Sequence, residues 1–231
     1  MKIIDYPILH IYQNYEESIK KQVDYFSKKN EVKSIYQIGS ITDLGISDID
    51  LVIIFKDEYK FDNNPRLLND KTGNYLFTHN LFGTGESNFI KSLNFTFFHR
   101  YKLLYGLEFN LKNNMPKIDQ SILKQQIALE YLVKMFINLS IVKSYKIIKL
   151  RALFLHLKAL LYDFEFLSFK QQRIIDLIEE GLYYRTNWFS KNITDEILIL
   201  WFEKFYNEFL IVLELILKSK KLFFDKIFFQ T

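Results

Sequence analysis

The chain contains no cysteine among its 231 residues, and it has only three prolines and seven glycines. The absence of cysteine excludes disulfide scaffolds, thiolate metal sites, iron–sulfur clusters and cysteine nucleophiles. Uncharged apolar runs of the roughly 18–20 residues that a membrane helix needs are also missing. The first residues, MKIIDYPILH, lack the pattern of a secretory signal. We therefore expect a cytoplasmic protein with no membrane partner.

Hydrophobic residues make up 49% of the chain and charged residues 25%, which is enough apolar material for one large or two small domains. The formal net charge is +4, and residues 116–231 carry the whole surplus. A nucleic-acid surface needs a basic stripe or cluster, whereas the positive charge here is spread out. We therefore do not expect nucleic acid as a partner.

The first half of the chain has short apolar runs bounded by turn residues. Its hydrophobic spacing predicts alternating helices and strands, because apolar residues recur either with helical period or in short blocks. The expected elements are a helix over 14–30, strands over 32–38 and 48–55, a loop over 57–74, a third strand over 74–84, and a helix within 87–106 that leads into a short strand at Lys102–Tyr105.

From Pro116 onward long helical periods dominate, and the segment LKNNMPK marks the change. The predicted fold class is α+β, with a mixed sheet and flanking helices in domain 1–115 and an antiparallel bundle of four helices in domain 116–231. The expected helices run from Asp119 to about Leu139, over Ser144–Phe164, from a Ser168–Gln171 capping box to Gly181, and from Thr194 to about Lys220.

Two acidic residues open the second predicted strand, in the sequence SDIDLVIIF. Asp48 and Asp50 occupy alternate positions, so both side chains should emerge on one face while Ile49 and Leu51 point into the core. Two adjacent carboxylates repel each other unless a cation lies between them. Oxygen ligands at this spacing suit Mg²⁺, which takes one or two carboxylates together with waters and substrate phosphates.

A Gly-Ser pair ends the preceding predicted strand. Gly39 would let a phosphate approach the backbone, and the hydroxyl of Ser40 could bind an anionic oxygen. Taken alone, an Asp-x-Asp or a Gly-Ser is more often an ordinary solvated turn. Their conjunction on neighbouring strands predicts a site for a metal-bound nucleoside triphosphate.

These motifs resemble the nucleotidyltransferase superfamily typified by DNA polymerase β, especially small bacterial and aminoglycoside-nucleotidyltransferase-like members. Ile38-Gly39-Ser40 and Ser47-Asp48-Ile49-Asp50-Leu51 match the family pattern, and Lys102–Gly106 resembles the short strand that closes the catalytic domain. The resemblance implies transfer of a nucleoside monophosphate from a triphosphate to a hydroxyl acceptor, a small molecule or a protein, with release of pyrophosphate. It implies two Mg²⁺ ions on Asp48 and Asp50, with Gly39, Ser40 and Ser47 at the triphosphate and the acceptor beside the helical domain.

One departure from the family concerns the third carboxylate, which active members usually carry on the next strand. The corresponding segment, Tyr75–Phe82, contains no Asp or Glu. His79 is the predicted catalytic base or metal ligand in that place, with a partly buried strand histidine as the alternative. Glu86 and Glu108 are weaker candidates for the missing acid.

Two other functions stay open. Without a third carboxylate, the chain could be a catalytically weak nucleotide-binding or antitoxin-like module. Arg151 and His156 have the R-x4-H spacing of HEPN ribonucleases, which would place an RNase in the helical half. The acceptor, the preferred base, and the choice between a homodimer and a complex with a partner protein also stay open.

Overall fold

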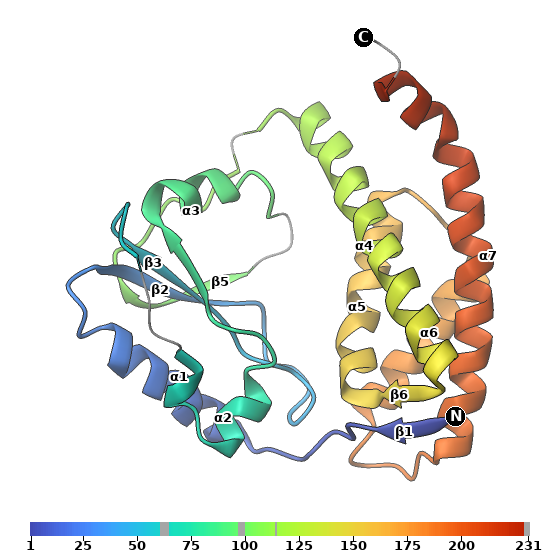
Figure 1. Ribbon diagram of the computed structural model, residues 1–231, viewed down its shortest axis with the longest axis horizontal. Helices are drawn as coiled ribbons and strands as arrows, with labels where there is room; N and C mark the ends of the chain where they lie inside the picture. The colour runs from blue at the N-terminus through green and yellow to red at the C-terminus, as the bar shows by residue number, and fades with distance from the viewer. Residues whose placement is uncertain (61–64, 97–99, 114, 229–231) are drawn as a thin grey trace. The chain divides into compact units, whose positions relative to one another are not determined.

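The computed structural model describes residues 1–60, 65–96, 100–113 and 115–228 of the chain (Figure 1). They form two compact units, Ile8–Gln120 and a second unit that joins Met1–Pro7 to Ser121–Thr231. Both helices and sheets are present, as the α+β prediction requires. The division near residue 120 lies close to the expected boundary at 115, but the first seven residues belong to the other unit.

A four-stranded mixed sheet forms the centre of the unit Ile8–Gln120. The strand order is β4-β3-β2-β5, with β2 antiparallel to both β3 and β5, and β3 parallel to β4. The strands are β2 (Val32–Ile38), β3 (Asp50–Phe55), β4 (Phe82–Gly85) and β5 (Tyr101–Gly106); the helices are α1 (Tyr12–Phe26), α2 (Lys71–Leu76) and α3 (Glu86–Ser92), with a 3-10 turn η1 at Pro65–Leu68.

Helices cover both faces of this sheet, α1 and α2 on one side and α3 on the other (Figure 1). Leu51 packs with Tyr15 of α1 and with Leu76 of α2. The next residue along β3, Val52, packs on the opposite face with Phe89 of α3. Because successive strand residues point to opposite faces, burial on both sides requires a continuous apolar run, and this explains the sequence LVIIF in β3.

The predicted strand over 74–84 is wrong. Residues 71–76 form α2, whose first turn is capped by the Asp70 carboxylate, which accepts a hydrogen bond from the Gly73 N–H at 2.8 Å. Only Phe82–Gly85 is extended. A side-chain cap satisfies a backbone donor that the helix leaves free, and it favours a helix over the strand that the apolar pattern suggested.

The strand expected at Lys102–Tyr105 is confirmed, and it ends at a glycine that the pairing requires. Gly106 has a φ of 88°, and a β-carbon built there would lie 1.9 Å from the Lys33 carbonyl oxygen. A backbone atom cannot move aside as a flexible side chain can, so only glycine permits β5 to approach β2 this closely.

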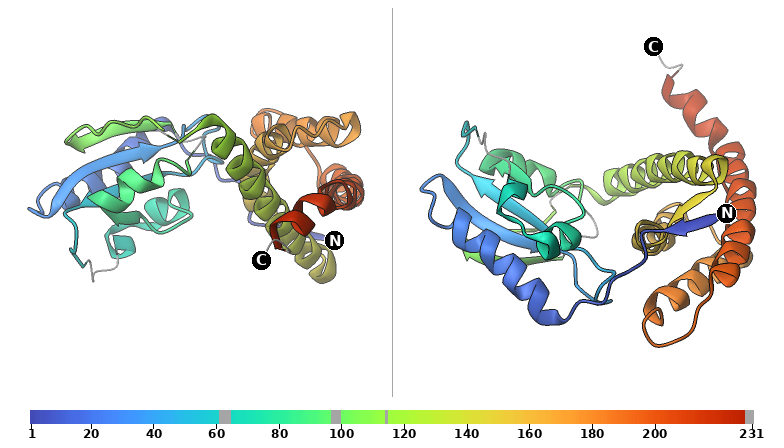
Figure 2. Two further views of the ribbon diagram at one scale, coloured as in Figure 1. Left: turned by 90° about the horizontal axis from the view of Figure 1, so that it is seen from above. Right: turned by 60° about the horizontal axis from the view of Figure 1, so that its bottom comes forward.

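The second unit contains four helices and a short two-stranded parallel sheet in its described residues. Strand β1 (Lys2–Ile4) lies beside β6 (Ile147–Lys149), as the right-hand view in Figure 2 shows. The helices are α4 (Lys117–Tyr145), α5 (Leu150–Phe166), α6 (Gln172–Thr186) and α7 (Asp195–Phe228). Among the described helices, none carries an apolar stretch long enough to cross a bilayer.

Several predicted helix boundaries in this unit are wrong, and α4 continues past the expected end near Leu139 to Tyr145. The helix expected from Ser144 begins only at Leu150, because Lys146 has a left-handed φ of 56° and the chain then forms β6. Helix α6 begins at Gln172 without a side-chain cap from Gln171, and Ser168 has a φ of 53° before it.

Gly181 does not end α6, as the sequence suggested, but lies inside it. A β-carbon at this position would lie 2.3 Å from the buried Trp201 ring, so the glycine allows α6 and α7 to pack closely. The predicted start of the last helix at Thr194 is confirmed, since its Oγ1 accepts a hydrogen bond from the Ile197 N–H at 3.5 Å.

Candidate functional site

The two acids predicted to bind metal lie at the start of β3. Asp50 is the first residue of the strand and pairs with Ile38, the last residue of β2. Ile49 and Leu51, which point the other way, are 2% and 1% exposed. The alternation therefore places the half-buried Asp48 and Asp50 on the opposite face, next to the turn that leaves β2.

The charges of Asp48 and His79 both affect the ionisation of the Asp50 carboxyl. Its pKa is raised to about 6, first by burial and then by the charge of the Asp48 carboxylate, while the charge of His79 opposes the rise. Neither carboxylate has a lysine or arginine partner within the part of the chain that the structure describes. An unneutralised pair of carboxylates favours protonation or the arrival of a cation.

His79 reaches this place through the parallel pairing of β3 and β4. Val52 pairs with Phe82, so the residues just before β4 run beside those just before Val52. His79 is exposed in the loop between α2 and β4 and not near the middle of a strand, as the sequence suggested. The structure thus places His79 where its charge acts on Asp50, by a different route from the one predicted, and the described residues show no three-membered metal-binding group there.

Thr78 is a site residue that the sequence analysis missed. Its hydroxyl donates a hydrogen bond to Oδ2 of Asp48. No sequence motif identifies Thr78, because a single threonine in a loop has no distinguishing pattern. Its role becomes visible only when the structure shows its contact with Asp48.

The other two acids that could have completed the site lie at the opposite end of the sheet. Glu86 forms an ion pair with Lys33, at the start of β2. The N–H of Leu107, next to Glu108, donates to the Lys33 carbonyl oxygen at 3.1 Å. Neither acid can therefore join Asp48 and Asp50. Accordingly, the described residues contain no group of three or more histidine, aspartate or glutamate side chains that could hold a metal ion.

The Gly39–Ser40 turn is exposed at the end of β2. Gly39 has a left-handed φ of 75°, and its N–H donates to the Arg100 carbonyl oxygen at 2.8 Å. Because the Gly39 N–H already donates this hydrogen bond, it is not available to bind a phosphate oxygen. Ser40 is exposed and lies two residues beyond Ile38, which pairs with Asp50.

Ser47 differs from the prediction, because its side chain is used inside the loop. It is 3% exposed, and its Oγ accepts hydrogen bonds from the N–H groups of Thr42 and Asp43 at 3.3 and 3.1 Å. The Tyr15 hydroxyl donates to the Ser47 carbonyl oxygen at 2.9 Å and accepts from the Gly45 N–H at 2.9 Å. These contacts fix the loop that carries Asp48, so Ser47 is a positioning residue.

The chain matches no protein-family model, no curated protein and no solved structure. The chemistry of the site therefore has to be judged from its own geometry. Asp48 and Asp50 lie at the start of β3, the exposed Gly39–Ser40 turn follows the strand paired with it, and the charge of His79 acts on Asp50.

The ribonuclease-like pair in the helical unit does not form a comparable group. Arg151 is 4% exposed, whereas His156 is half-buried and its Nδ1 lies 2.9 Å from the Tyr131 hydroxyl oxygen. Residues five apart on an α-helix are separated by roughly 140° around its axis. The arginine and the histidine consequently lie on different faces of α5.

Proposed function

We propose that the unit Ile8–Gln120 binds a nucleoside triphosphate with Mg²⁺ and transfers its nucleoside monophosphate to a hydroxyl acceptor. The observation that supports this proposal is the pair of neighbouring carboxylates, Asp48 and Asp50, without a cationic partner in the described residues and beside an exposed Gly-Ser turn. A carboxyl whose pKa is raised by a second carboxyl gains stability when a divalent cation binds between them.

Each side chain has a role in the proposed reaction. Asp48 and Asp50 would hold Mg²⁺, which when bound would neutralise phosphate charge and polarise the reacting oxygens. The Ser40 hydroxyl would donate a hydrogen bond to a phosphate oxygen. Thr78, through its hydrogen bond to Asp48, would keep that carboxylate oriented.

The proposed step is an in-line displacement at the α-phosphorus. The oxygen of the acceptor hydroxyl forms a bond to phosphorus, and the bond to the pyrophosphate oxygen breaks. The acceptor proton passes to the His79 imidazole, which lies close enough to Asp50 to affect its ionisation. Pyrophosphate leaves with the displaced electron pair.

The test is an assay of pyrophosphate release with each of the four ribonucleoside triphosphates, Mg²⁺ and a panel of hydroxyl acceptors that includes the protein itself. We expect Asp48→Asn and Asp50→Asn to lower the rate by about 100-fold or more. Asp24→Asn, on the exposed surface of α1, is the matched control and should leave the rate unchanged. Equally tight, Mg²⁺-dependent triphosphate binding by Asp48→Asn and the parent would contradict the assignment.

A binding-only module is the second candidate. It is favoured by the position of Glu86 and Glu108 at the far end of the sheet, which leaves the two carboxylates without a third acid among the described residues. Mg²⁺-dependent triphosphate binding without pyrophosphate release from any nucleotide would establish this function instead.

A further inference from the structure

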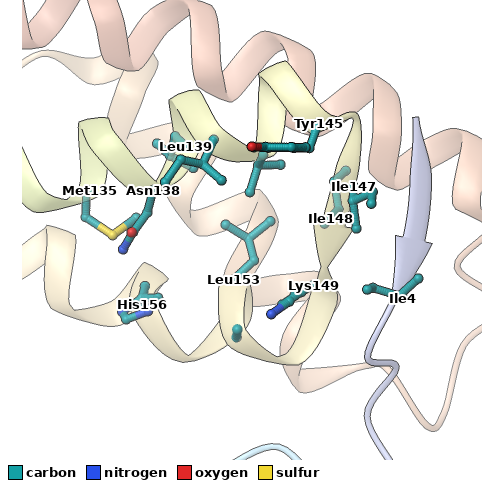
Figure 3. A pocket seen from close by; sticks show the side chains of 13 residues that line it. Ile4, Met135, Asn138, Leu139, Tyr145, Ile147, Ile148, Lys149, Leu153 and His156 are labelled. Carbon is teal, nitrogen blue, oxygen red and sulfur yellow. The ribbon is translucent and has the colours of Figure 1, made fainter.

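A cavity of about 390 Å³ opens in the helical unit, between α4, β6 and α5, with Ile4 of β1 at one end (Figure 3). This volume falls within the range of small-molecule sites in proteins. We propose that the cavity binds a small amphipathic carboxylate, a ligand with an apolar chain or ring and one anionic head. The proposal is independent of nucleotidyl transfer at Asp48 and Asp50.

The cavity wall is mainly apolar, which calls for an apolar ligand body. Met135 and Leu139 come from α4, Ile148 from β6 and Leu153 from α5. The chain builds this wall because the left-handed Lys146 ends α4 and lets β6 run alongside β1 before α5 begins. Transfer of the ligand's apolar surface from water to such a wall favours binding.

The charge of the cavity calls for an anionic head. Among the lining residues, Lys149 is the cation and no side chain is acidic. Lys149 has no ion-pair partner in the described part of the chain, and the half-buried Asn138 amide has no hydrogen-bond partner there either. A carboxylate placed against Lys149 would complete the ion pair, and Asn138 offers a separate hydrogen-bonding group elsewhere on the wall.

The end of the cavity opposite Ile4 is polar and held in place. Figure 3 shows the Asn138 amide and the His156 ring at this end. The Nδ1 atom of His156 lies 2.9 Å from the Tyr131 hydroxyl oxygen, so a contact between α4 and α5 fixes the ring. A pre-positioned polar end favours a ligand of defined length, because little side-chain entropy is lost on binding.

A small molecule suits this cavity better than a membrane surface. Membrane-binding surfaces present several basic residues around a convex apolar face. Here one lysine borders a concave space whose wall comes from four elements, β1, α4, β6 and α5. That concave shape suits a small molecule.

The experiment compares decanoate, decanol and decyltrimethylammonium by isothermal titration calorimetry on the full chain. We expect decanoate to bind most tightly. Lys149→Gln should weaken decanoate binding by about three- to tenfold and leave decanol unaffected. The matched control, Lys158→Gln, changes an exposed lysine of α5, the helix that follows Lys149, that does not line the cavity, and it should bind decanoate as the parent does. Ala152→Phe fills the cavity and should abolish binding of both decanoate and decanol.

Several results would overturn the proposal. Equal affinity for the anionic and cationic probes would remove the charge argument, as would unchanged decanoate binding in Lys149→Gln. Undiminished binding by a folded Ala152→Phe variant would place the ligand elsewhere. Concentration-dependent dimers in sedimentation velocity that Ala152→Phe dissociates would assign the cavity to a second copy of the chain.

Discussion

The two units of the molecule each hold an aspartate whose pKa is raised, and the two differ in cause and setting. The pKa of Asp50 rises to about 6 through burial and the charge of Asp48, whereas that of Asp163 rises to about 7 through burial alone. Asp163 is 5% exposed within α5, and its Oδ2 atom has no hydrogen-bond partner. A shifted pKa alone therefore does not mark a site for chemistry.

The surroundings of the two aspartates make the distinction. Asp50 is half-buried and follows an exposed turn, so a charged ligand can approach it. Near Asp163 stands Tyr131, whose own pKa is raised by burial and by the Asp163 charge. Asp50 thus lies where a cation can approach and relieve the repulsion, whereas Asp163 is buried in the helical unit near a tyrosine.

The largest effect that would sharpen this comparison is expected at Asp163. Its folded-state pKa is above the unfolded value, so the folded protein loses stability as the pH rises from about 4 to about 7. Asp163→Asn should raise the free energy of unfolding by about 2–3 kcal/mol at pH 8 and by almost nothing at pH 4. Urea denaturation at the two pH values measures this, with the exposed Glu179→Gln as control. An equal effect of Asp163→Asn on stability at both pH values would show that the Asp163 carboxyl does not have a raised pKa.

A smaller effect is expected at Asp50, because it is only half-buried. Its pKa is also raised, so without metal Asp50→Asn should stabilise the protein by about 1–2 kcal/mol at pH 7.5 and by almost nothing near pH 4. Millimolar Mg²⁺ should raise the melting temperature of the parent and leave that of Asp50→Asn unchanged. Thermal denaturation with and without Mg²⁺ checks both results. The same Mg²⁺ response in parent and variant would refute a metal site at Asp50, and Asp24→Asn is the control.

The smallest effect concerns the Tyr131 hydroxyl. Tyr131→Phe removes its hydrogen bond to His156 and should lower the free energy of unfolding by about 0.5–1.5 kcal/mol. Tyr145→Phe, at a residue that is 74% exposed, should change stability by less, and urea denaturation compares the two. Neither variant should affect pyrophosphate release. A loss of that activity in Tyr131→Phe would mean that the polar group in the helical unit takes part in the chemistry.

Local patterns predicted the part of the site that depends on one strand. Residues 32–38 form a strand as expected, and the alternation of Asp48, Ile49, Asp50 and Leu51 correctly separated the two faces. Both features follow from strand geometry, which the order of residues fixes directly.

Local sequence patterns could not predict the contacts between segments that are distant in the sequence. The approach of His79 to Asp50 depends on the parallel pairing of β4 with β3, and the formation of β6 depends on a lysine in a left-handed conformation. Neither has a local signature, since lysine favours helices and parallel pairing involves residues far apart in sequence. The 74–84 segment was misjudged because a capping aspartate at residue 70 outweighed an apolar pattern.

The pairing of β1 with β6 has a consequence for how the polypeptide matures on the ribosome. The unit Ile8–Gln120 has all its strands available once residue 120 has emerged, so it can fold as a unit during synthesis. Lys2–Ile4 cannot pair, and its backbone groups stay bonded to water, until Ile147–Lys149 appear. Slow translation between these two points would therefore lengthen the life of an unpaired edge, which is the kind of intermediate that chaperones recognise.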